Sequence, residues 1–186
     1  MEFWAPWAGE AACTIPPLPP MLDFSYYNVG LNFVRDRVVA CHLTTCVGLG
    51  LFGWEKIADT VYVRTDASSS VLQGKVLLAG GEVGSDTTEL VDVEKGDSEE
   101  SFPLVPGRFW HCAIQLSESA VVMTGGLERS GGTATLVTLF TLGEDGQATS
   151  TDLPGLSQGR FQHACGAYMV ADTQVNPAEN QPCSRR

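Results

Sequence analysis

Two short runs of apolar residues, each closed by a pair of glycines, set the pattern of the chain. The runs are residues 76–81 and 121–126, and their first glycines, Gly80 and Gly125, are 125 − 80 = 45 residues apart. Apolar runs of this length that are rich in valine and leucine predict buried strands. A repeat interval of this size is typical of stacked units of secondary structure.

Each glycine pair belongs to a larger unit that we predict to contain four strands. The first two strands are joined by a short turn, such as Gln73-Gly74, which suits a β-hairpin. A Thr-rich third strand and a weaker fourth strand follow, before a Leu-Pro segment. Four antiparallel strands in about 45 to 50 residues make the size of a propeller blade. The first three strands are expected at 67–72, 75–79 and 87–91 in one copy and at 111–116, 120–124 and 134–140 in the other.

A second motif, Arg-x-x-His, repeats in step with the glycine pairs. It occurs as Arg108 to His111 and as Arg160 to His163, with the histidines 163 − 111 = 52 residues apart. We interpret these side chains as structural hydrogen-bond donors to loop carbonyls, because packed sheets bury carbonyl groups where they meet. Asp66 stands 14 residues before Gly80, as His111 stands before Gly125, so we expect Asp66 to replace the histidine in the earlier copy, which Arg64 opens.

These motifs resemble the kelch repeat, in which an inner Arg-x-x-His strand is followed by a strand that closes on Gly-Gly. The resemblance covers residues 2–171 and is strongest over 63–171. It implies an all-β fold, a fragment of a kelch-type β-propeller with about three four-stranded antiparallel blades and two partial ones. The expected structural motif residues are Gly80, Gly81, Gly125, Gly126, Arg64, Arg108, His111, Arg160, His163 and the outer-strand Trp54.

The resemblance also divides the chain into units. It implies a half blade at 1–20, blades at 21–62, 63–106 and 107–159, the first strand of a further blade at 160–171, and a polar irregular tail at 172–186. In the least regular blade, strands at 24–33 and 37–41 flank a turn at Arg35-Asp36, and Cys41-His42 stand in place of two glycines. One amphipathic helix over 31–43 is the alternative there.

Charge and composition narrow the classes of partner. The formal net charge is −11 with only 11 Lys and Arg, which argues against nucleic acid and favours a neutral or basic partner. No apolar stretch is long enough for a transmembrane helix, and the first residues show no basic-then-apolar leader. The compartment stays open: cytoplasmic, or extracellular if a longer parent is secreted.

The cysteines and histidines raise the question of chemistry. A disulfide between Cys41 and Cys46, or reduced buried thiols, are both open, and Cys112 and Cys165 hold nearly equivalent positions after the repeated histidines. The rival function is a galactose-oxidase-like metal or sugar-active enzyme, but the tyrosines sit in no matching motif, and His42 is an irregular single candidate ligand. We therefore expect no catalysis and no cofactor.

The function that these features favour is protein–protein binding through loops that follow the second strands. The candidate contact loops are 82–86 with Glu82 and Asp86, 127–133 with Glu128 and Arg129, and 44–52. A truncated gene product without an independent role is a further alternative. Open sheet edges offer a route to self-association, and pairing of 1–20 with 163–171 is a route to a small closed ring.

Overall fold

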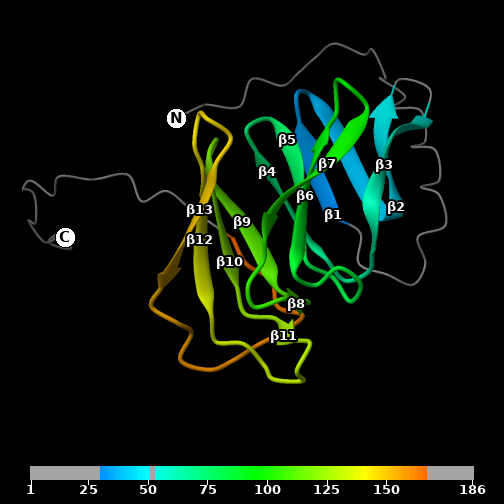
Figure 1. Cartoon of the computed structure of the whole chain (residues 1–186). Helices are drawn as coiled ribbons and strands as arrows, with labels where there is room; N and C mark the ends of the chain where they lie inside the picture. The colour runs from blue at the N-terminus through cyan, green and yellow to red at the C-terminus, as the bar shows by residue number, and fades with distance from the viewer. Residues whose placement is uncertain (1–29, 51–52, 167–186) are drawn as a thin grey trace, which may run out of the picture.

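The structure, a computed structural model, describes residues 30–50 and 53–166, and within these ranges it is built of strands without a helix (Figure 1). All the paired strands are antiparallel, in three sheets of three or four strands and one sheet of two. The all-β prediction is confirmed. The alternative of a helix over 31–43 is wrong, because those residues form two paired strands and the turn between them.

Sheet I has the order β1-β2-β3, formed by Gly30–Val34, Arg37–Gly50 and Gly53–Arg64. Its first turn is at Arg35 and Asp36, as expected, and both residues have positive φ (48° and 63°). Strand β2 does not stop near Cys41 but runs on to Gly50. The predicted contact loop at 44–52 is therefore wrong over 44–50, which lie in strand β2 alongside β3, and 51–52 lie outside the described residues.

Sheets II and III repeat one meander of four strands. Sheet II has the order β4-β5-β6-β7, and sheet III has the order β9-β10-β12-β13. The second strands match the predicted ranges, and the predicted third strand of sheet III is shifted toward its C-terminal end. The bounds are Ser68–Leu72, Lys75–Ala79, Thr87–Asp92 and Asp97–Pro103 for sheet II, and Cys112–Ser117, Ala120–Thr124, Val137–Leu142 and Ala148–Leu153 for sheet III.

The segments between and after these sheets include features that the sequence pattern did not predict. Two short strands, β8 (Arg108–Phe109) and β11 (Leu127–Glu128), pair with each other. The predicted strand at 163–171 is wrong over 163–166, which have no strand structure, and 167–171 lie outside the described residues. The predicted half blade at 1–20 and the tail at 172–186 also lie outside them.

The three large sheets pack face to face in chain order, so that sheet II is covered on both sides (Figure 1). Toward sheet I it presents Val76, Leu78 and Val91, and toward sheet III it presents residues that include Leu77 and Phe102. Each fully buried aliphatic side chain contributes roughly 1.5–3 kcal/mol of transfer free energy. On sheet III the ring of Phe140 stacks on Phe102, with ring centroids 4.9 Å apart, and fills the space between the two sheets.

Candidate functional site

The glycine pairs lie where one sheet meets the segment that opens the next unit. A Cβ atom on Gly80 would lie 2.1 Å from the carbonyl oxygen of Arg108, and one on Gly125 would lie 2.5 Å from that of Arg160. Both glycines have positive φ, 63° and 61°. Only glycine combines this backbone conformation with so close an approach. We call these two contacts the II–III junction and the C-terminal junction.

The second glycine of each pair ties the junction together by a backbone hydrogen bond. The N–H of Gly81 donates to the carbonyl of Arg108 at 3.2 Å, and the N–H of Gly126 donates to that of Arg160 at 2.8 Å. Arg160 itself has an exposed side chain, so its backbone is the part that the junction uses.

The repeated histidines lie in these junctions and bind hydroxyl groups rather than loop carbonyls. The Nε2 atom of His111 is 2.6 Å from the hydroxyl of Ser68, and that of His163 is 3.0 Å from the hydroxyl of Thr124. Burial, and then the charges of Arg108 and His163, lower the pKa of His111 to about 3. Burial and the nearby Arg160 also lower the pKa of His163. Both imidazoles are therefore neutral at pH 7.

Ser68 and His111 have the spacing of a nucleophile and its base, but their surroundings suit a structural contact. Both residues are buried. An imidazole with a pKa of about 3 is a weak base at neutral pH. In the described part of the chain no hydrogen bond to Nδ1 of His111 orients the ring, whereas an activated pair has such a third group.

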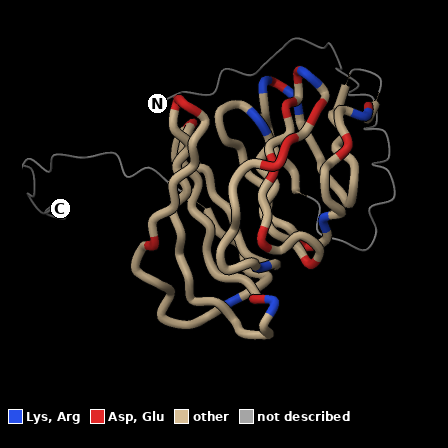
Figure 2. Tube along the Cα trace, in the orientation of Figure 1, with Lys and Arg blue, Asp and Glu red and all other residues tan. Residues whose placement is uncertain are grey.

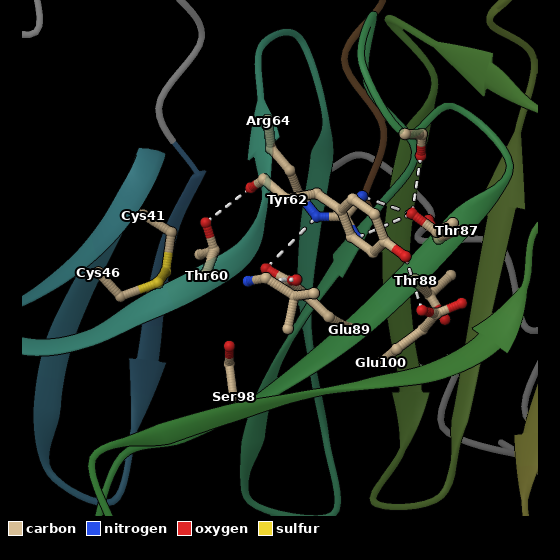
Figure 3. A network of polar contacts seen from close by, with 12 residues as sticks. Cys41, Cys46, Thr60, Tyr62, Arg64, Thr87, Thr88, Glu89, Ser98 and Glu100 are labelled. Atoms are coloured by element: carbon tan, nitrogen blue, oxygen red, sulfur yellow. Dashed lines mark hydrogen bonds and ion pairs between the residues drawn. A yellow bond between two sulfur atoms is a disulfide. The ribbon is translucent and has the colours of Figure 1, made fainter.

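Arg64 opens the earlier unit and holds the loop that closes the second strand of sheet II (Figure 3). Its Nη1 atom donates to the carbonyl of Gly80 at 2.7 Å, and Nη2 donates to the hydroxyl of Thr87 at 3.1 Å. Its Nε atom lies 3.4 Å from a carboxylate oxygen of Glu89, and both side chains are almost fully buried, with 2% and 0% exposure. This arginine matches the expected donor to a loop carbonyl.

Glu89 joins the network to sheet I. Its second carboxylate oxygen accepts a hydrogen bond from the N–H of Val61 at 3.0 Å. Burial raises the pKa of Glu89 and lowers that of Arg64, while each charge partly offsets the effect on the other. Next to this pair the hydroxyl of Tyr62 donates to Glu100 at 2.7 Å, and this bond raises the pKa of Tyr62 (Figure 3).

Arg108 takes the same position in the next unit, with a different partner. Strand register places Thr138 opposite Met123, as Glu89 lies opposite Leu78. Arg108 is fully buried and its Nη2 donates to the hydroxyl of Thr138 at 3.2 Å. That hydroxyl lies 3.3 Å from a carboxylate oxygen of Asp152. Asp152 therefore reaches the buried guanidinium of Arg108 only through the hydroxyl of Thr138, whereas Glu89 lies directly beside Arg64.

A third, altered copy of the junction lies between sheets I and II, which we call the I–II junction. His42 is five residues past Arg37 on β2, as Gly80 is five residues past Lys75 on β5, and each of the two earlier residues follows a hairpin turn. The next residue, Leu43, has a positive φ of 50° and pairs with Arg64, as Gly81 binds Arg108.

The histidine position of the I–II junction is Ala67, not Asp66. Ala67 follows Arg64 by three residues and lies 3.5 Å from a Cβ built on Gly81, where His111 approaches Gly126 in the next unit. Counting back from the glycine pairs misplaces it, because β9 carries one extra residue in a β-bulge against β10, whereas β4 and β5 pair without a shift in register. His42 and Ala67 line one small cavity of about 10 Å³. In the I–II junction the imidazole therefore comes from the glycine position of β2, whereas in the II–III junction it comes from the histidine position, His111.

The residues just before these histidine positions line a hollow at one end of the sheets. Asp66, Trp110 and Gln162 all have positive φ, at 60°, 54° and 51°. The N–H of Trp110 donates to Asp66, and that of Gln162 donates to Trp110, both at 3.0 Å to carbonyl oxygens. These three residues, with His111 and His163, border a hollow of about 430 Å³. The ladder of backbone bonds thus brings residues that are far apart in the sequence into one surface.

Two of the expected contact loops lie at this same end. Glu82 is exposed and its N–H donates to the carbonyl of Thr65 at 2.9 Å, beside the hollow. Asp86 is also exposed. Glu128 lies in β11 and is half-buried, and Arg129 beside it is exposed. Trp54 lies elsewhere, half-buried in β3 opposite Leu49.

Within residues 30–50 and 53–166 the structure contains two disulfides. One joins Cys41 to Cys46 within β2, which the sequence left open, and the other joins Cys112 to Cys165. The second crosses 53 residues and fastens the C-terminal junction to the first strand of sheet III. In the described ranges no group of three or more His, Cys, Asp or Glu side chains is arranged to hold a metal ion.

Comparison of the chain with protein-family models and with curated proteins gave no match. Over the residues that the structure describes, no helix has the length and apolar character needed to cross a membrane.

Proposed function

We propose that this chain is a partial β-propeller of kelch type that binds another protein, without catalysis, through the loops at one end of its sheets. The observation that carries the proposal is the common location of the two loops and the hollow. The loops that contain Glu82 and Glu128 follow the second strands, and both adjoin the segments that line the hollow.

The contrast between buried junction residues and exposed loop residues supports a binding role. The buried side chains of Arg64 and Arg108, the repeated histidines and the glycine pairs all make contacts within the fold, so substitutions there act on folding. The loop residues Glu82, Asp86 and Arg129 are exposed and carry charge. Variable loops on a rigid scaffold are the usual place for recognition. The net charge of −11 favours a neutral or basic partner.

A selection from a displayed peptide library tests the proposal, with the whole chain as bait. We expect selected peptides to be neutral or basic, and the double variant Glu82→Ala/Asp86→Ala to weaken their binding at least tenfold. Glu118→Ala and Glu144→Ala serve as matched controls, because these exposed acids lie in hairpin turns at the opposite ends of the strands. Selected peptides that bind the control variants worse than the loop variants would contradict the proposed surface.

A further inference from the structure

Sheet III has an outer face that points away from sheet II. This face is equivalent to the face of sheet II that sheet III covers. Register places Val122 opposite Ile114 and Leu139, and Leu139 opposite Thr151. Alternation turns these side chains away from Val121, Met123 and Phe140, which pack on sheet II. The equivalent residues of sheet II, Leu77 and Leu90, are buried by sheet III. We call the set Ile114, Leu139, Thr151 and Leu153 the free face of sheet III; Val122, in the middle of the same face, is itself only 8% exposed.

This face has no charged side chain. The strands of sheet III contain a single charged residue, Asp152, which alternation points toward sheet II, and Figure 2 shows how few charges lie on these strands. Leu153 at its margin is 36% exposed. In a chain with a net charge of −11, an uncharged apolar face is the surface on which two copies meet with least repulsion.

Sheet I presents the complementary kind of face. On β1, Asn32 donates a hydrogen bond to Ser69 and Val34 packs toward sheet II, so Leu31 and Phe33 point the opposite way. Leu31 is 58% exposed and Phe33 is 67% exposed. We call these two residues the free face of sheet I. The equivalent face of sheet III is the one that packs on sheet II within the molecule. The free face of sheet I is therefore the kind of face that covers a neighbouring sheet.

We propose that a second copy of this chain covers both free faces. The free face of sheet III of each copy packs on the free face of sheet I of the other, and two copies of three sheets close one ring of six. This pairing repeats the contact already made between sheets II and III. The inference rests on the propeller architecture proposed above but not on loop binding. Because the two faces in each contact are unlike, a closed dimer forms only if the rotation between the two copies is half a turn. Any other rotation gives a larger ring or an open polymer.

Light scattering on the whole chain tests this inference. We expect twice the chain mass of 19.9 kDa for the wild type. We expect monomers for Phe33→Glu and for Leu153→Glu, and because these positions are 67% and 36% exposed we expect both variants to keep the fold, which circular dichroism checks. Val83→Glu and Val105→Glu are matched controls, since these residues are 51% and 72% exposed in loops, and they should stay dimeric.

Mixing the two monomeric variants gives the sharper result. A copy with Phe33→Glu still has an intact sheet III face, and a copy with Leu153→Glu still has an intact sheet I face. One wild-type contact is restored in the mixture, so a weaker dimer should reappear. A wild-type monomer, an open series of polymers, or a dimer lost only in Leu153→Glu would each overturn the proposal. Peptide binding that depends on Glu82 would survive all three results, so the two proposals fail separately.

Discussion

The I–II junction and the II–III junction are two solutions to one packing problem. In the II–III junction Gly80 makes room for the imidazole of His111, whereas in the I–II junction His42 stands at the glycine position and Ala67 at the histidine position. The imidazole has changed sides, and the volume between the sheets is roughly kept. The comparison shows that the repeat preserves close packing and a backbone contact between the sheets rather than particular residue types.

The largest expected effect comes from filling the glycine position where the histidine is still opposite. Gly80→Ala places a Cβ 2.1 Å from the carbonyl of Arg108 at a φ of 63°, so we expect a loss of unfolding free energy above about 3 kcal/mol, from left-handed strain plus overpacking. Gly146→Ala is the matched control, with a φ of 77° and no atom within 4 Å. It should cost only about 1–2 kcal/mol. Equal losses in urea unfolding would contradict the close approach.

The next effect separates the two buried arginines. Glu89→Gln leaves the buried Arg64 without its acid and should cost about 3–5 kcal/mol. Thr138→Val removes a neutral partner from Arg108 and should cost about 1–3 kcal/mol. Chemical denaturation at pH 7 measures both. If Thr138→Val proves the more damaging change, the two units do not differ in the way described.

A third effect is a loss of stability in acid that belongs to the II–III junction. His111 is neutral in the folded state with a pKa of about 3, while in the unfolded chain it takes up a proton below about pH 6.5. The unfolded state therefore binds more protons as pH falls from 6.5 toward 3, and stability falls with it. Between pH 7.5 and pH 5 this histidine accounts for about 2 kcal/mol. His111→Gln should lower the pH dependence by that amount, and an unchanged slope would show that the ring is already solvated.

Much of this arrangement could be predicted from local pattern. The runs that contain Leu77 and Val122 and the turn at Gln73-Gly74 predict strands and hairpins correctly, because burial and turn chemistry are local properties. The placement of Asp66 as the histidine substitute was wrong, because counting back from the glycines did not allow for the extra residue of the β-bulge in β9. The fixed spacing from Arg64 to Ala67 was the better signal in the sequence.

Other features depend on contacts across the fold and left no local trace. The ion pair of Arg64 with Glu89 joins residues whose proximity follows only from strand register. The extension of β2 through Cys41 to Gly50 depends on pairing with β3, which has little apolar alternation of its own. The hollow beside Trp110 and Gln162 depends on backbone bonds between separate units.

The smallest expected effect is an energetic coupling between positions 42 and 67. It tests whether the imidazole has exchanged sides between the II–III junction and the I–II junction. Ala67→His adds a second imidazole opposite His42 and should cost about 1–3 kcal/mol by overpacking. His42→Gly empties the same space and also destabilises. Together the two substitutions rebuild the arrangement of the II–III junction. Ala67→His combined with Gly146→Ala is the control pair, whose costs should add.

The double-mutant cycle between His42 and Ala67 is the most direct test of the claim that all three junctions are copies of one arrangement. Unfolding free energies of the wild type, both single variants and the double variant give the coupling. We predict that the double variant is more stable than the sum of the two single losses allows, by about 1–3 kcal/mol. Additive losses would mean that His42 and Ala67 do not share one space, and the repeat of the junction would then be contradicted.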